Sequence, residues 1–67
     1  MTVGQRIQHY RKLQGLSQEE LGQKLLVSRQ TISLIERGDY SPSVTLALKI
    51  AKVFGVTVEE VFIYTED

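Results

Sequence analysis

The side chains best suited to recognise another molecule are concentrated between residues 28 and 37, in the sequence Ser-Arg-Gln-Thr-Ile-Ser-Leu-Ile-Glu-Arg. Ile32 and Ile35 are three residues apart and would share the buried face of a helix. Guanidinium groups, a carboxamide, a hydroxyl and a leucine remain on the outer face, from Arg29, Gln30, Ser33, Leu34 and Arg37. Arginine can bond guanine in bidentate fashion, glutamine can do so with adenine, and an apolar tip can contact the thymine methyl. The outer face therefore matches what a DNA duplex presents in its major groove, although a polar surface helix without a binding role would look similar.

Composition excludes several kinds of site. The chain has 67 residues, the size of one small domain (residues 1–67), with no cysteine and a single histidine, His9. A disulfide framework, a thiolate metal site and a site built on a histidine pair are therefore impossible, and we expect no metal and no cofactor. The acidic pairs at 19–20 and 59–60 lie in expected first helical turns, where carboxylates interact favourably with the helix dipole. Nothing in the sequence predicts an enzyme.

Charge and hydropathy bear on the compartment and on the partner. The start, Met-Thr-Val-Gly-Gln-Arg, lacks the features of a signal peptide, and no apolar run is long enough for a membrane span, so we expect a cytoplasmic protein that does not contact membranes. The formal net charge is zero, but residues 1–37 carry six basic and three acidic side chains, whereas residues 38–67 carry two and five. Such a dipolar molecule can present a positive face to phosphates, with few phosphate contacts per subunit.

Short helices are expected to position the outer face of residues 28–37. Apolar spacing and capping residues predict helices over 4–14, 18–25, 28–37 and 44–54, and a further short helix from Val58. Such helices with short connections form a compact all-α five-helix bundle. The Phe-Ile-Tyr run at 62–64 is apolar on successive residues, which suits a short C-terminal extended segment or a dimer contact. The expected core consists of apolar residues on the inner helix faces: Ile7, Tyr10, Leu13, Leu21, Leu25, Ile32, Ile35, Ala47, Ile50, Ala51 and Phe54.

The second and third helices are expected to cross steeply. Ser17 and Glu20 have the spacing of a capping box, which places the start of the second helix. Ser28 caps the next helix, so the two helices are joined by a very short connection, as in a helix-turn-helix. Gly22 lies inside the second helix, where glycine costs about 1 kcal/mol relative to alanine. We expect the compensation to be a close approach of a second helix backbone at Gly22.

Three segments in register carry a family resemblance: Ser17-Gln18-Glu19-Glu20-Leu21-Gly22, Val27-Ser28-Arg29-Gln30-Thr31-Ile32-Ser33 and Ile35-Glu36-Arg37-Gly38. With them the chain resembles the Cro/repressor-type (XRE) helix-turn-helix family, and it looks closest to the small stand-alone regulators. The resemblance implies the fold of a phage-repressor DNA-binding domain. It also implies a helix-turn-helix motif over 17–37 with the recognition helix over 28–37.

The resemblance also assigns roles to individual residues. Base contacts are implied for Arg29, Gln30, Ser33 and Leu34. Phosphate contacts are implied for Gln18, Gln23, Ser28, Arg37, Tyr40 and Ser41. An ion pair between Arg11 and Glu36 would fix the angle at which the recognition helix is presented.

One residue departs from the family pattern. Position 26, in the turn, is usually glycine in this family because the residue there adopts a left-handed conformation, but here it is Leu26. A leucine in that conformation costs on the order of 1 kcal/mol. We therefore predict a positive φ near Leu26 and some strain in the turn.

The function that these features favour is sequence-specific regulation of transcription. We expect a dimeric repressor that binds double-stranded DNA at a pseudo-palindromic operator. The dimer interface is expected at Val53, Val58, Phe62, Ile63 and Tyr64. The alternative is an antitoxin or adaptor that acts mainly through protein–protein interaction. Such a module would not need Arg29 and Gln30 on its outer face, and a toxin-binding tail is usually longer than residues 62–67.

Overall fold

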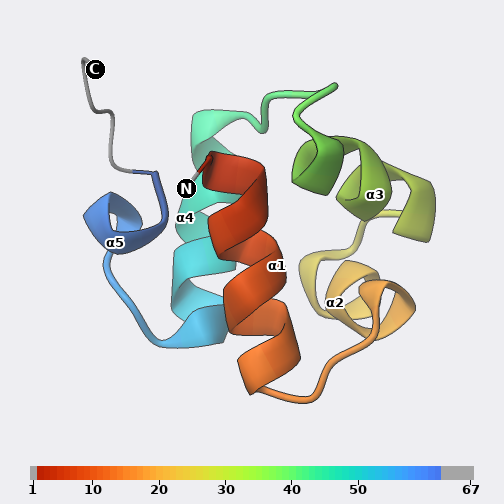
Figure 1. The fold of residues 1–67 in the computed structure, drawn as a ribbon, viewed down its shortest axis with the longest axis horizontal. Helices are drawn as coiled ribbons and strands as arrows, with labels where there is room; N and C mark the ends of the chain where they lie inside the picture. Colours follow the sequence, from red (N-terminus) through yellow and green to blue (C-terminus); the bar gives the residue numbers. More distant parts are fainter. Residues whose placement is uncertain (1, 63–67) are drawn as a thin grey trace.

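The chain folds into five short helices in the computed structural model, which describes residues 2–62 (Figure 1). The helices are α1 (Val3–Leu13), α2 (Gln18–Leu25), α3 (Arg29–Arg37), α4 (Val44–Phe54) and α5 (Val58–Phe62). No strand occurs among the described residues, so the predicted all-α five-helix class is confirmed. Phe62 ends α5, and the rest of the predicted extended segment, Ile63 and Tyr64, lies outside the described residues. None of the described helices is long and apolar enough to cross a membrane.

Hydroxyl side chains begin the helices. Ser17 caps α2, and its hydroxyl accepts a hydrogen bond from the Glu20 N–H while the Glu20 carboxylate accepts one from the Ser17 N–H, as predicted. The backbone N–H of Ser17, followed by the Ser17 hydroxyl, stabilises the Glu20 carboxylate and holds the pKa of this carboxyl group below its ordinary value. Thr2 and Gln5 form a second capping box that the sequence analysis missed. It starts α1 one residue earlier than predicted, at Val3.

The core is built from the inner faces of all five helices. The buried apolar residues are Ile7, Leu21, Leu25, Ile32, Ile35, Ile50, Ala51, Phe54 and Val61. Tyr10 is half-buried and stacks on Phe54, with ring centroids 5.6 Å apart. The prediction for Leu13 is wrong, because its side chain is 68% exposed. Six residues after Ile7 along an α-helix, Leu13 lies about 120° around the axis from it.

Two glycines allow backbones to approach closely. In Figure 1, α1 lies between the pair α2–α3 and the pair α4–α5. A Cβ at Gly4 of α1 would overlap the carbonyls of Ile35 and Glu36 in α3. A Cβ at Gly22 would lie 2.7 Å from the Val27 carbonyl oxygen. The expected close approach at Gly22 is present, but its partner is the turn that leads into α3, not the body of a second helix.

The turn between α2 and α3 has the predicted left-handed residue. Leu26 has φ 60° and ψ 40° and is the C-cap of α2. The next N–H, from Val27, donates to the Gly22 carbonyl at 2.9 Å, which closes the end of α2. Leu26 is the sole residue other than glycine with positive φ within residues 2–62. Its side chain is 85% exposed, so burial within the chain does not offset the backbone strain.

Replacing Leu26 with glycine is expected to stabilise the protein. Glycine adopts this conformation without a Cβ clash, so Leu26→Gly should raise the free energy of unfolding by up to about 1 kcal/mol. Leu26→Ala keeps the Cβ and is the matched control, with an expected change within about 0.5 kcal/mol. Urea unfolding followed by circular dichroism measures both variants. A glycine variant less stable than the alanine variant would show that the turn is not strained.

Candidate nucleic-acid interface

The residues predicted to contact bases lie together on the outer side of α3. One shallow depression of about 350 Å³ is lined by Arg29, Gln30, Ser33, Leu34 and Arg37. Ile32 and Ile35, on the opposite side of α3, are each no more than 2% exposed and anchor the helix in the core. The split between an apolar inner face and a polar outer face, inferred from the spacing of residues 28–37, is therefore present.

The chemistry of this depression is that of hydrogen-bond donors around an apolar centre. Arg29 and Gln30 are exposed in the first turn of α3, and their side chains form no hydrogen bond to residues 2–62. Leu34 is half-buried, not fully exposed as expected, because it sits inside the depression with Gln30 and Arg37 one turn away on either side. The depression thus combines polar groups free to bond a ligand with an apolar contact.

Arg37 forms a weak ion pair at the end of α3. Its Nε lies 3.5 Å from a carboxylate oxygen of Asp39, and the two side chains are 62% and 61% exposed. Exposed pairs of this kind contribute about 0–1 kcal/mol. The Arg37 guanidinium could therefore exchange Asp39 for a phosphate at little cost.

Ser28 has a structural role at the start of α3. Its hydroxyl accepts a hydrogen bond from the Thr31 N–H at 3.2 Å and lies 3.0 Å from the Thr31 hydroxyl. The capping role predicted for Ser28 is confirmed. Its contact with a phosphate remains a prediction.

A buried ion pair joins α1 to α3. Arg11 Nε donates to Glu36 Oε2 at 2.7 Å and Arg11 Nη2 donates to Glu36 Oε1 at 3.2 Å, with side chains only 10% and 5% exposed. Arg11 Nη1 donates to the carbonyl of Leu16 at 2.9 Å. The ion pair expected between Arg11 and Glu36 is therefore present, and it is bidentate.

Gln18 belongs to the same network, which the sequence analysis did not anticipate. Its Nε2 donates to Glu36 Oε1 at 3.1 Å. Gln18 is the first residue of α2, so one carboxylate of α3 receives hydrogen bonds from both α1 and α2. No signal in the sequence pointed to this contact, because the two residues are 18 positions apart. The amide keeps a second N–H with which it could reach a phosphate.

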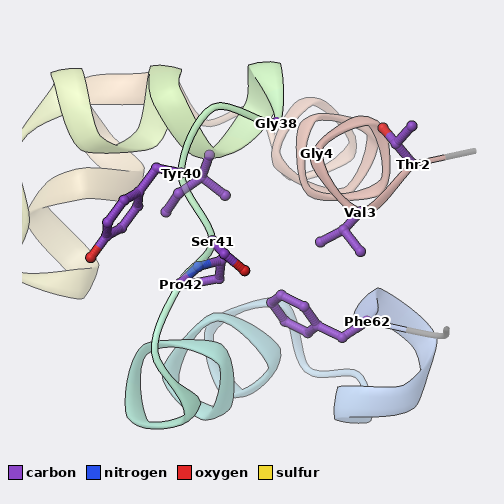
Figure 2. Close-up of a pocket in the computed structure, with 9 residues that line it drawn as sticks. Thr2, Val3, Gly4, Gly38, Tyr40, Ser41, Pro42 and Phe62 are labelled. Carbon is purple, nitrogen blue, oxygen red and sulfur yellow. The ribbon is translucent and has the colours of Figure 1, made fainter.

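The loop between α3 and α4 holds two further predicted phosphate contacts. Tyr40 is 48% exposed, and Ser41 is exposed. Both line a cavity of about 260 Å³ together with Val3, Pro42 and Phe62. Figure 2 shows the Tyr40 ring turned away from Val3 and Phe62, with its hydroxyl on the outer side of the loop. Gln23, the remaining predicted phosphate contact, is exposed near the end of α2.

The residues predicted for a dimer interface are only partly described. Val53 and Phe62 are half-buried and pack against the core of their own chain, and Val58 is half-buried. Ile63 and Tyr64 lie outside the described residues. Their role in dimerisation remains a prediction.

Comparison with known proteins identifies the class. The model of the helix-turn-helix family matches residues 7–61, so the chain belongs to the helix-turn-helix family, of the Cro/repressor (XRE) type. It is 56% identical over 62 residues to a helix-turn-helix-type transcriptional regulator from Methanocaldococcus jannaschii, covering 92% of this chain and 94% of the relative.

Solved structures share the fold. The P22 c2 repressor, crystallised with a synthetic operator, superposes with a TM-score of 0.90 at 27% identity, over 94% of this chain and 96% of that one. The N-terminal DNA-binding domain of SinR from Bacillus subtilis has a TM-score of 0.84 at 35% identity, over 97% and 96% of the two chains. The fold implied by the sequence resemblance is therefore confirmed.

The buried ion pair provides a test of how α3 is held. Arg11→Met leaves the Glu36 carboxylate buried without a cation, so we expect the free energy of unfolding to fall by about 3–5 kcal/mol. Arg37→Met breaks the exposed pair with Asp39 and should cost at most about 1 kcal/mol. Urea unfolding of the two variants measures the difference. Equal losses of unfolding free energy in the two variants would mean that the buried Arg11–Glu36 pair holds α3 in place no more strongly than the exposed Arg37–Asp39 pair does.

Proposed function

We propose that this protein is a sequence-specific transcriptional regulator that binds double-stranded DNA with α3 in the major groove. The observation that carries the proposal is the outer face of α3, where Arg29, Gln30, Ser33 and Leu34 line one depression while Ile32 and Ile35 fix the helix from behind. The P22 c2 repressor and SinR, both crystallised with DNA, support DNA as the ligand. Residues with these donors and this arrangement have no evident task in an enzyme active site.

The base contacts follow from side-chain chemistry. The Arg29 guanidinium can donate two hydrogen bonds to O6 and N7 of guanine, and the Gln30 amide can pair with N6 and N7 of adenine. Ser33 can bond to either base edge, and Leu34 offers its methyl groups to a thymine methyl. Each good bidentate contact discriminates against the wrong base by about 1–3 kcal/mol.

The phosphate contacts would set the register on the duplex. Gln18 begins α2, where the free N–H groups and the helix dipole attract an anion. Arg37 adds a guanidinium at the C-terminal end of α3. Additional contacts are proposed for Gln23, Ser28, Tyr40 and Ser41.

We further propose a cytoplasmic homodimer that represses transcription from a pseudo-palindromic site. Two copies would place their α3 helices in successive major grooves, with half-sites about one helical turn apart. Dimerisation would bury additional apolar surface, which matters for a domain of this size because a small core alone gives modest stability. The proposed contact surface is Val53, Val58, Phe62, Ile63 and Tyr64.

Selection from a randomised duplex pool, followed by sequencing, tests the proposal. The protein should enrich a palindromic site, and Arg29→Ala and Gln30→Ala should each relax the preference at one base position per half-site, by about 1–3 kcal/mol. Lys12→Ala, which removes an exposed cation from the end of α1, is the control and should retain the full preference. Enrichment of no sequence, with steeply salt-dependent binding alone, would contradict specific recognition.

A further inference from the structure

A second depression lies on a part of the surface that the proposed DNA contacts do not use. It is formed by the end of α2, the turn after it and the outer side of α4, and its volume is about 340 Å³. Its lining, which defines the α2–α4 groove, is Lys24, Leu25, Leu26, Lys49, Lys52 and Val53. Of these residues, Val53 also belongs to the proposed dimer surface, and the other five do not. It shares no residue with the depression on α3. We propose that this groove docks an acidic amphipathic helix of a partner protein.

The conformation of Leu26 is the first observation in favour of a partner. The residue occupies a left-handed turn position at which glycine would be unstrained, yet it presents an apolar side chain that is 85% exposed. Within the chain, this side chain gains little burial to offset the strain. The side chain therefore suits a contact with another molecule.

The charge around the groove determines the chemistry of the partner. Three of the lining residues are lysines, and none is acidic. Within residues 2–62, the ion pairs are Arg11–Glu36 and Arg37–Asp39, so none of these lysines is neutralised by a direct ion pair. The carboxylate of Glu20, one turn before Lys24, accepts a hydrogen bond from the Ser17 N–H and attracts the Lys24 charge without forming a direct ion pair with it. A partner with acidic side chains would complement the groove.

The apolar lining favours a protein segment over a DNA backbone. The exposed Leu26 and the half-buried Val53 offer no hydrogen-bond donor from their side chains, and a phosphate backbone has little apolar surface with which to cover them. An amphipathic helix buries its apolar face in such a groove. Lys49 and Lys52 are three apart on α4 and so face the same side, which suits acidic residues at helical spacing on the partner. Lys24 would face acids on the other flank of the bound helix.

The groove can be tested with a synthetic peptide. The probe is a short helical peptide with leucine at positions i, i+3, i+4 and i+7 and glutamate on both flanks, titrated into ¹⁵N-labelled protein. We expect saturable shifts of amide resonances at residues 24–26 and 49–53. Two matched peptides separate the contributions: serine in place of leucine, and lysine in place of glutamate, should each abolish saturable binding.

Protein variants locate the contact. Leu26→Gly removes the exposed side chain without straining the turn, and it should weaken peptide binding at least about tenfold. The double variant Lys49→Glu, Lys52→Glu should do the same. Leu13→Gly removes another exposed leucine, at the end of α1, and should leave the affinity unchanged. Circular dichroism verifies that each variant is folded.

Several outcomes would overturn the proposal. Absence of saturable binding, equal binding of the serine peptide, or an unchanged affinity of the Leu26→Gly variant would each do so. If a DNA duplex shifts the same resonances, and Leu26→Gly lowers DNA affinity by the same factor, the groove belongs to the DNA interface. Shifts at the groove that depend on protein concentration without peptide would assign it to contacts between copies of the chain.

Discussion

The Glu36 carboxylate is the point at which three helices are tied together. It lies near the end of α3 and accepts hydrogen bonds from Arg11 of α1 and from Gln18 of α2. A carboxylate buried this deeply is tolerated only when it is paired with a cation and fully hydrogen-bonded. The same hydrogen bonds hold the Arg11 and Gln18 side chains in place. The angle of α3 relative to α1 and α2, on which presentation of Arg29 and Gln30 depends, follows from this network together with Gly4 and the core.

The domain combines a small core with strongly specified helix ends. Ser17, Ser28 and Ser43 each accept a hydrogen bond from an N–H of the first helical turn, and such caps contribute about 1 kcal/mol each. Short helices would otherwise be marginal, because helix formation is cooperative with an unfavourable nucleus. Caps fix where each helix starts, and the apolar faces then determine how the helices pack. The outer face of α3 and the α2–α4 groove remain at the surface.

Local signals made most of the fold predictable, and long-range contacts account for the errors. The capping box at Ser17 and the positive φ of Leu26 each depend on a few neighbouring residues, and both were predicted correctly. The buried face of α1 was misjudged at its C-terminal end, where Leu13 is exposed and the charged residue Arg11, four positions after Ile7, is buried instead. The hydrogen bond between Gln18 and Glu36 depends on how α2 crosses α3, which spacing alone does not determine. The composition of the α3 face was predicted in full, but the partial burial of Leu34 was not.

A crystal structure of the protein with the duplex that it selects would test directly whether α3 reads DNA. We expect α3 to lie in the major groove, with the Arg29 guanidinium and the Gln30 amide within hydrogen-bond distance of base edges. The Arg11–Glu36 pair should keep its bidentate geometry in the complex. A structure in which the duplex contacts another face, with Arg29 and Gln30 exposed to solvent, would contradict the central claim that α3 is the helix that reads DNA.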